Sequence, residues 1–244
     1  MDLRFFRRMA QGAFVVPMRR ARFAQGAFSR MQVVPIRMKG DRRFLILGLV
    51  WTVLVLFGGR MAMQFENTAG SSGNPRTQLP TELRAAAGKD AFVLVMLAHP
   101  NCPCTRASLI ELERLTARVR GRLATFVILS RPGASVEELH ASPMGKAAAK
   151  IPGVSVIPQP LLASEAFAGE TSGQTLLYEP GGILVYSGGI TRGRGHQGDN
   201  AGADAVVARV AGRTRELLRL PAFGCPLKNP SASQLRDDPS WQRQ

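Results

Sequence analysis

Residues 92–115 read FVLVMLAHPNCPCTRASLIELERL, and this stretch decides the fold. Its first six residues are all apolar, as in a strand that is covered on both faces. Beyond Pro103 the leucines recur at helical spacing, and proline suits a first helical turn because no backbone donor is needed there. We therefore predict a strand over residues 91–98, a helix over residues 103–120, and Cys102 at the start of that helix.

The position of Cys102 has chemical consequences. Unpaired backbone amides and the helix dipole favour negative charge at a helix start. Such a position can lower the pKa of a thiol from about 8.5 to roughly 3.5–7.5. Because the thiolate is the nucleophile in disulfide exchange, Cys102 is a candidate reactive thiolate. His99 and Arg106 are near it in sequence and are candidate thiolate-stabilising groups.

The rest of the domain alternates between strand and helix patterns. Two short apolar runs, residues 175–178 and 183–186, flank an EPGG turn and predict a hairpin. The order of elements predicts an α/β fold of three layers, with a mixed central sheet between helices. The further elements expected, in chain order, are a strand at 123–130, a helix at 135–149 capped near Ser135, a strand at 153–157, a helix at 161–168 and a closing helix at 201–219.

An apolar segment precedes the domain. Residues 44–59 contain no charged side chain, and the apolar character continues to residue 63 if Arg60 snorkels to the membrane interface. No polar face appears along the segment, which argues against a buried core helix. We predict one transmembrane helix over residues 44–63 and favour an uncleaved anchor over a cleaved signal peptide. The two arginines before it place the domain outside the cytoplasm by the positive-inside rule.

The net charge of +15 is concentrated at one end of the chain. Residues 1–43 contain 11 of the 32 Lys and Arg residues but only two of the 17 acidic residues. A basic chain suggests nucleic acid, but this cluster lies directly before the apolar segment, where membrane topology signals are found. We expect no nucleic-acid partner and predict a disordered cytoplasmic segment over residues 1–43, unless translation starts at Met31 or Met38.

Composition sets the other boundaries. Residues 64–80 are rich in Gly, Ser, Asn and Thr and predict a flexible linker. The globular domain is expected over residues 81–227, followed by a polar, disordered tail at 228–244. The three cysteines of the chain are too few for a disulfide framework, so at least one thiol is free or paired only transiently.

The strand, the Cys-Pro turn, the helix and the second buried strand resemble the thioredoxin-like superfamily, most closely its membrane-anchored TlpA-like and peroxiredoxin-like branch. The sequences HPNCPCTRASL (99–109), SGGITRGRGHQGDNAG (187–202) and FGCPL (223–227) are also similar to a bacterial group of thioredoxin-like proteins called RedB. The resemblance covers residues 80–227. It implies a thioredoxin-like fold that carries out thiol–disulfide exchange.

The resemblance also assigns roles to the cysteines. Aligned on the LERL sequence at 112–115, Cys102 matches the attacking cysteine of the family and Thr105 matches the resolving one, so the second thiol has moved to Cys104. Side chains two residues apart in a helix point to nearly opposite faces, so a Cys102–Cys104 disulfide needs a distorted first turn. Three alternatives stay open: Cys104 resolves, Cys225 folds back as the resolving thiol, or Cys102 acts alone through mixed disulfides.

Two further positions depart from the family pattern or extend it. Gly173 matches the cis-proline, whose loop presents backbone to a substrate and keeps metals from the thiols, so glycine there predicts a flexible and open loop. His196 lies in a polar, glycine-rich loop at 193–200. That loop either caps the closing helix through Asp199 or Asn200, or brings His196 to the cysteines as an acid, a base or a metal ligand.

Together these observations predict a membrane-tethered, extracytoplasmic thiol–disulfide oxidoreductase with a CPCT active-site turn, held in a bacterial inner membrane by residues 44–63 with its domain in the periplasm. The expected partners are protein thiols and disulfides and a membrane electron donor. No flavin or nicotinamide site is apparent, and no cofactor and no metal are assigned. The alternatives are a Cu(I) metallochaperone using Cys102, Cys104 and either His99 or His196, and a non-catalytic thioredoxin-like scaffold.

Overall fold

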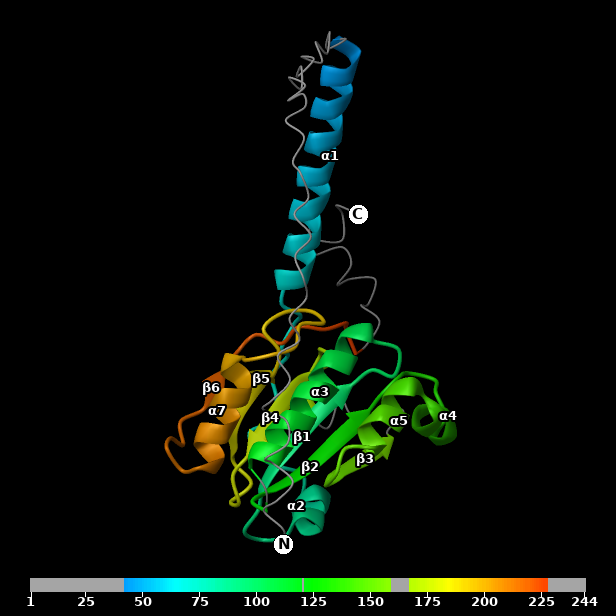
Figure 1. Cartoon of the computed structure of the whole chain (residues 1–244). Helices are drawn as coiled ribbons and strands as arrows, with labels where there is room; N and C mark the ends of the chain where they lie inside the picture. The colour runs from blue at the N-terminus through cyan, green and yellow to red at the C-terminus, as the bar shows by residue number, and fades with distance from the viewer. Residues whose placement is uncertain (1–41, 120, 159–166, 228–244) are drawn as a thin grey trace, which may run out of the picture. The chain divides into compact units, whose positions relative to one another are not determined.

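The computed structural model describes residues 42–119, 121–158 and 167–227 (Figure 1). The predicted helix at 161–168 lies almost wholly outside these residues, as do the segment before residue 42 and the tail at 228–244. The elements in chain order are α1 (Arg42–Asn67), α2 (Thr81–Ala87), β1 (Phe92–Ala98), α3 (Pro103–Arg118), β2 (Leu123–Leu129), α4 (Val136–Ala141), α5 (Pro143–Ala149), β3 (Val154–Pro158), β4 (Gln174–Tyr178), β5 (Leu184–Gly189), α7 (Ala201–Val210) and β6 (Leu218–Arg219).

The strands form one mixed sheet in the order β3-β2-β1-β4-β5-β6. Strands β1, β2 and β3 are parallel, β4 is antiparallel to both β1 and β5, and β6 is parallel to β5. Parallel neighbours need a crossover, which α3 and the α4–α5 pair supply, whereas β4 and β5 need only a turn. The predicted mixed sheet and its hairpin are confirmed.

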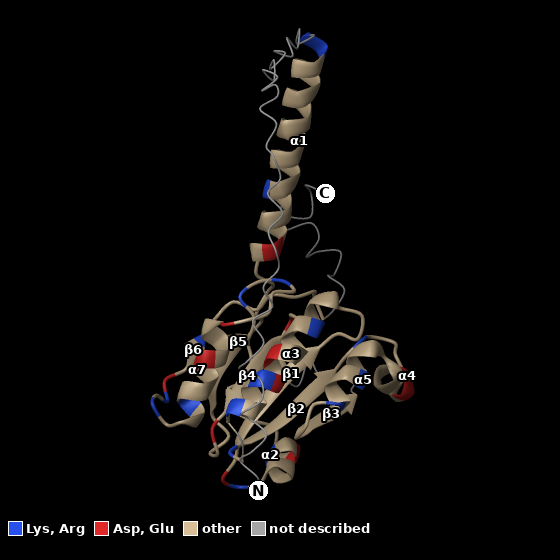
Figure 2. Cartoon of the chain, in the orientation of Figure 1, with Lys and Arg blue, Asp and Glu red and all other residues tan. Residues whose placement is uncertain are grey.

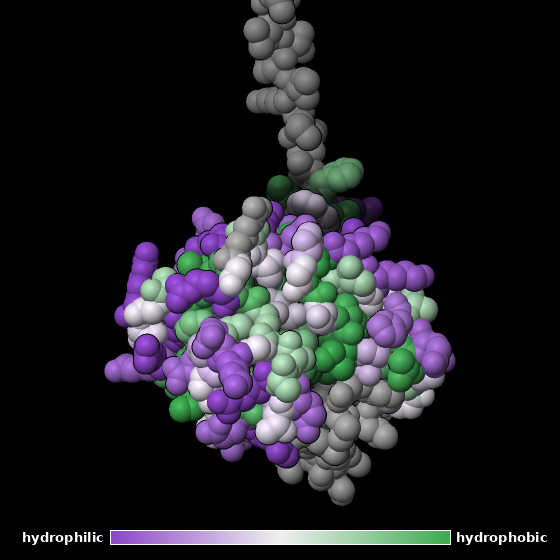
Figure 3. Space-filling view, turned by 90° about the horizontal axis from the view of Figure 1, so that it is seen from below, coloured by the Kyte–Doolittle hydropathy of each residue, from purple (hydrophilic) through white to green (hydrophobic). Residues whose placement is uncertain are grey.

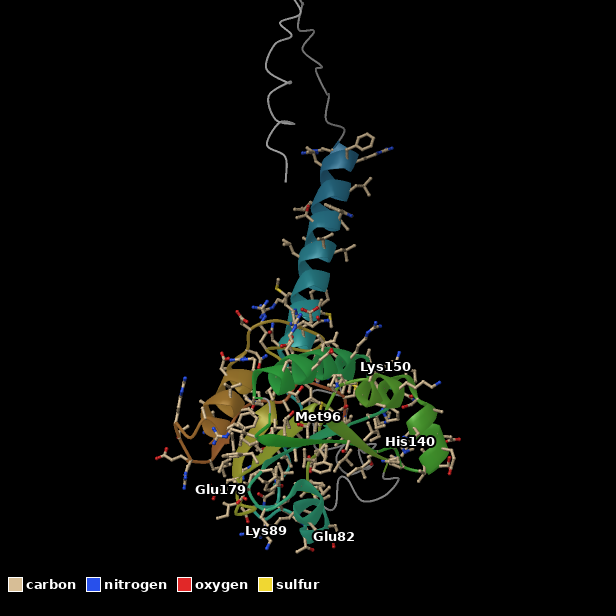
Figure 4. The ribbon with its side chains drawn as sticks, turned by 60° about the horizontal axis from the view of Figure 1, so that its bottom comes forward. Glu82, Lys89, Met96, His140, Lys150 and Glu179 are labelled. Carbon is tan, nitrogen blue, oxygen red and sulfur yellow. The ribbon has the colours of Figure 1, made fainter. Side chains whose placement is uncertain are left out.

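Strand β1 lies inside the sheet and is covered on both faces. Its side chains alternate between two hydrophobic clusters, as the two-residue period of a strand requires. Met96 packs on the face of α3 and α7, Val95 packs on the opposite face, and both are completely buried. Figure 4 shows Met96 in the interior, whereas His140, Lys150 and Glu179 lie at the periphery. The continuous apolar run in the sequence is explained by this double coverage.

Helices cover the two faces of the sheet unequally (Figure 1). On one face, α3 contributes the buried residues Leu109, Leu112 and Leu115, and α5 and α7 pack beside it. The leucines whose spacing predicted the helix therefore lie on its buried side. Burial of each leucine side chain stabilises the fold by about 1.5–3 kcal/mol. The other face is covered in part by α2, a short helix that the sequence pattern did not indicate, through Leu83 and Ala87.

The helix predicted over 135–149 is two helices, α4 and α5. Ser135 forms the predicted cap, because its hydroxyl accepts from the backbone N–H of Glu138. The break comes at Ser142, which has an extended backbone and accepts from the N–H of Gly145, and Pro143 then opens α5. The residue before a proline is disfavoured in the helical conformation, which explains why one helix ends and another begins there.

The closing helix was predicted to reach residue 219, but α7 ends at Val210. Gly212 follows with a φ of +75°, a conformation that suits glycine and ends helices. The buried Arg209 then donates to the backbone carbonyls of Val185 and Glu216, which holds the returning chain against β5. The last residues of the predicted helix form β6 instead.

The segment predicted as a flexible linker is attached to the domain. Residues 64–67 belong to α1, and isolated bridges pair Gly70 with Ala222 and Gln78 with Ile183. Backbone carbonyls between these bridges accept hydrogen bonds from side chains before and within β4. The prediction of a free tether is wrong here, because small polar residues allow the chain to lie close to the sheet as well as to move.

Helix α1 differs in character from the domain. It has 26 residues, and its most apolar stretch is not buried against any other part of the chain that the structure describes. It carries no charge between Arg43 and Arg60, as Figure 2 shows. By length and composition it is long and apolar enough to cross a membrane. On the domain face seen in Figure 3, by contrast, hydrophilic side chains are interspersed with hydrophobic ones, as on a surface in contact with water.

Candidate thiol site

Cys102 stands at the start of α3, as predicted. Its backbone is extended, with φ −81° and ψ 114°, and Pro103 is the first residue of the helix. The N–H of Cys102 donates to the carbonyl of His99 (3.2 Å), and the carbonyl of Cys102 accepts from the N–H of Thr105 (3.1 Å). These bonds fix the turn between β1 and α3, so the thiol position is set by the backbone.

The sulfur of Cys225 lies against that of Cys102. The two Sγ atoms are 3.0 Å apart, and both cysteines are free thiols. A disulfide bond is about 2.05 Å long, so this contact is a hydrogen bond between reduced sulfurs. Cys102 is only 1% exposed, whereas Cys225 is partly exposed. The sequence left three alternatives for the resolving thiol. The structure places one of the candidates, Cys225, beside Cys102.

The contact shifts the pKa values of the two thiols in opposite directions. The pKa of Cys102 is lowered to about 4, chiefly by the hydrogen bond from the Cys225 thiol and secondarily by Thr105, against the opposing effect of burial. The pKa of Cys225 is raised, because its proton is held by the Cys102 thiolate and because the thiol is partly buried. At neutral pH Cys102 is therefore the thiolate and Cys225 is the thiol.

Two hydroxyl groups, those of Ser172 and Thr105, also support the thiolate. The N–H of His99 donates to Ser172 Oγ (2.8 Å), and Ser172 Oγ lies 2.6 Å from Thr105 Oγ1. Because Ser172 Oγ already accepts from His99, its own proton is available to Thr105, and the Thr105 hydroxyl then donates to Cys102. Thr105, which the resemblance matched to a resolving cysteine, is thus a hydrogen-bond donor to the thiolate.

The groups that the sequence assigned to stabilise the thiolate are less important than these two donors. Burial lowers the pKa of His99, and Arg131 lowers it further against the Cys102 charge, so the ring is neutral at pH 7. Arg106 is exposed to solvent, where its charge is screened. Burial therefore opposes the positive charge that the sequence analysis expected of His99, whereas the Cys102 charge favours it.

Cys104 lies in the first turn of α3 and is half-buried. Burial raises the pKa of its thiol, and the negative charge of Cys102 raises it further, whereas Arg194 acts in the opposite direction. Cys104 is consequently a thiol at neutral pH. A hydrogen bond with Cys102 contributes to the raised pKa of Cys104 as well. The sulfur that lies 3.0 Å from that of Cys102 is the one of Cys225.

The loop at Gly173 is neither open nor loose. Gly173 has a φ of +89°, and its N–H donates to the carbonyl of Leu97 (2.7 Å). A Cβ at this position would lie 2.8 Å from Ser108 Oγ, so glycine is required by both conformation and space. The neighbouring N–H of Ser172 donates to the carbonyl of Cys225 (2.8 Å). The expectation of an open loop is wrong because residues around Cys225 fill the space in front of it.

The loop at 193–200 brings a different residue to the thiols than the one predicted. His196 Nε2 lies 3.7 Å from a carboxylate oxygen of Glu66, and its Nδ1 lies 3.1 Å from the carbonyl of Arg194, so these contacts direct it toward the end of α1. Arg194 instead donates to the carbonyl of Gly224 and affects the pKa of Cys104. Asn200 caps α7 through the N–H of Ala203, as one reading of the loop predicted.

Within the described ranges, no group of three or more His, Cys, Asp or Glu side chains is arranged to hold a metal ion. The Cu(I) alternative requires a histidine, either His99 or His196. His196 is engaged with Glu66. The arrangement at Cys102 is better described as a thiolate held by hydrogen-bond donors.

Comparison with known proteins bears on the fold. No protein-family model and no curated protein matches the chain. An uncharacterised conserved protein from Geobacillus kaustophilus is similar in structure, with a TM-score of 0.50, 19% identity, 68% of this chain covered and 95% of that one. A secreted disulfide oxidoreductase from Mycobacterium tuberculosis has a TM-score of 0.34 and 15% identity, with 52% of this chain and 85% of that one covered. A thioredoxin-like protein from Aeropyrum pernix has a TM-score of 0.36 and 13% identity, with 66% of this chain and 98% of that one covered. The domain has the thioredoxin-like fold that the sequence predicted, with β1 central, β2 parallel to it and β4 antiparallel to it.

Proposed function

We propose that the chain is a membrane-tethered thiol–disulfide oxidoreductase in which Cys102 attacks and Cys225 resolves. The observation that supports this most directly is the 3.0 Å contact between the two sulfurs, with the pKa of Cys102 lowered to about 4. The attacking group must be a thiolate, and the resolving group must keep its proton until the mixed disulfide has formed. The two cysteines are in these forms at neutral pH.

The reductive direction runs in two exchanges. The Cys102 thiolate attacks one sulfur of a client disulfide, a Cys102–client disulfide forms, and the second client sulfur leaves as a thiolate. Attack consumes the charge that held the Cys225 proton, so the Cys225 thiol becomes easier to deprotonate. Its thiolate then attacks Cys102, a Cys102–Cys225 disulfide forms, and the first client sulfur leaves with its electron pair. A dithiol donor must return two electrons and two protons, and the reverse sequence oxidises a client dithiol.

The setting of this chemistry is proposed from α1. The helix is long and apolar enough to cross a bilayer, and Arg42 and Arg43 precede its apolar part. By the positive-inside rule we propose that the domain lies outside the cytoplasm, in the periplasm of a bacterial cell whose inner membrane holds α1. The clients are then extracytoplasmic proteins with thiols or disulfides, and the dithiol donor is a membrane partner.

Mapping the bonded pair tests the proposal. The full-length chain in detergent is oxidised, blocked, digested without reduction and analysed by mass spectrometry. We expect a peptide that joins Cys102 to Cys225, retained in Cys104→Ser and lost in Cys225→Ser. A single turnover is followed without added thiol, by mixing the reduced chain with a protein disulfide, and Cys225→Ser should stop at the mixed disulfide whereas the wild type releases the reduced client. A Cys102–Cys104 bond in the oxidised protein, or release of the client by Cys225→Ser at the wild-type rate, would refute the assignment of Cys225.

A further inference from the structure

The chain segment that carries Cys225 is paired with the loop before β4 as a short strand. The N–H of Ser172 donates to the carbonyl of Cys225 (2.8 Å), and the N–H of Leu227 donates to the carbonyl of Glu170 (2.8 Å). An antiparallel bridge joins Thr171 to Pro226 between these bonds. We call residues 224–227 the cover strand. Its backbone pairs with the N–H of Ser172 and the carbonyl of Glu170, which would otherwise lack these backbone partners.

The cover strand occupies the position from which a sulfur contacts Cys102. Its Cys225 sulfur is in contact with Cys102, and Cys102 is 1% exposed. Disulfide exchange requires the attacked sulfur to come within bonding distance of the thiolate, in the place that the Cys225 sulfur now fills. A client sulfur therefore reaches Cys102 only when the cover strand has moved away.

The register of the cover strand depends on a glycine. A Cβ on residue 224 would overlap the carbonyl oxygen of Ser172 and approach the side chain of Thr171. Gly224 is buried and precedes Cys225 directly, and its carbonyl accepts from Arg194. Any chain that presents a cysteine to Cys102 in this register therefore has room only for glycine at the preceding position.

We propose that the cover strand is a displaceable internal ligand, and that an extended client segment with a Gly-Cys sequence takes its place on Glu170–Ser172 before exchange. This inference rests on the proposed function and adds access control and client selection to it. Extended peptides bind exposed strand edges through backbone hydrogen bonds, and pockets for individual side chains give specificity. Here the specificity comes from a site too narrow for a Cβ.

Two peptides and one reaction test the proposal. The full-length chain carries Cys104→Ser and Cys225→Ser, which leaves Cys102 as the only thiol. The peptides are AFGCPL and AFACPL, blocked at both ends, each with its cysteine joined to thionitrobenzoate as a mixed disulfide. The Cys102 thiolate attacks the peptide sulfur, a Cys102–peptide disulfide forms, and thionitrobenzoate leaves as a coloured thiolate. The glycine peptide should react about tenfold faster, because overpacking by one methyl group at a rigid backbone is strongly unfavourable.

A variant of the cover strand provides the second arm. Gly224→Ala in the same background should displace the strand and raise the reaction rate of the glycine peptide about tenfold, because the open form becomes the major one. Gly181→Ala is the matched control, since a Cβ there meets nothing closer than 3.7 Å, and it should leave the rate unchanged. Circular dichroism checks that both variants are folded, and the peptide comparison stands if Gly224→Ala is not.

The outcomes separate this inference from the proposed function. Equal rates for the two peptides, or an unchanged rate in folded Gly224→Ala, would overturn the inference while the Cys102–Cys225 disulfide could still be found in the oxidised wild type. Absence of that disulfide would instead remove the proposed function on which the inference rests.

Discussion

Replacing Cys225 tests how the Cys102 thiolate is stabilised. Cys225→Ala removes the hydrogen bond that most strongly lowers the pKa of Cys102, whereas Cys225→Ser keeps a donor in the same place. A hydrogen bond to a charged group contributes about 1.5–3 kcal/mol, and one pKa unit corresponds to about 1.4 kcal/mol. The alanine variant should therefore raise the pKa of Cys102 from about 4 by about one to two units. The remaining donors are Thr105 and the helix start.

The measurement is thiolate absorbance as a function of pH, on full-length protein in which Cys104 is serine. Cys102 is then the only thiol in both variants, so the titration belongs to one group. The serine variant should titrate at lower pH than the alanine variant, and both should titrate below the ordinary thiol value of about 8.5. Equal pKa values in the two variants would refute the role assigned to the Cys225 hydrogen bond.

Three further predictions concern stability and reactivity. Between about pH 5 and 8 the folded thiol pair binds one proton and the unfolded chain binds two, so the unfolding free energy of the reduced protein should rise with pH by at most about 1.4 kcal/mol per unit; thermal melting of Cys102→Ser should lack this component. Gly173→Ala should destabilise the domain by about 1–3 kcal/mol, because φ is +89°, whereas Gly181→Ala melts as the wild type does. Arg194→Gln should raise the pKa of Cys104, measured as slower alkylation at pH 8; unchanged alkylation would exclude that charge effect.

The sequence predicted the parts of the fold that local patterns determine. The apolar run of β1, the leucine spacing of α3 and the proline after Cys102 place a thiol at a helix start, and the structure has all three. The caps at Ser135 and Asn200 were also accessible, because a capping side chain bonds to backbone only three residues away.

The features that sequence patterns did not determine depend on contacts between distant residues. Cys225 lies 123 positions from Cys102, and no periodicity reports such a pairing. The chain after α7 is held by hydrogen bonds from Arg209 to the carbonyls of Val185 and Glu216. The sequence pattern remains helical to residue 219 and gives no sign of these contacts. The FGCPL sequence was the available signal for the cover strand, since a glycine before a cysteine and a proline after it suggest a constrained backbone.

The separation of the two sulfurs along the chain has a topological consequence. When Cys102 and Cys225 are joined, the part of the domain that follows β1 becomes a closed ring. Closing a loop of that size raises the free energy of the unfolded chain by about 5 kcal/mol through lost entropy. Reduction converts the ring to a linear chain that unfolds more readily. Proteases and unfolding forces would therefore act on the reduced form of the protein in preference to the disulfide-bonded form.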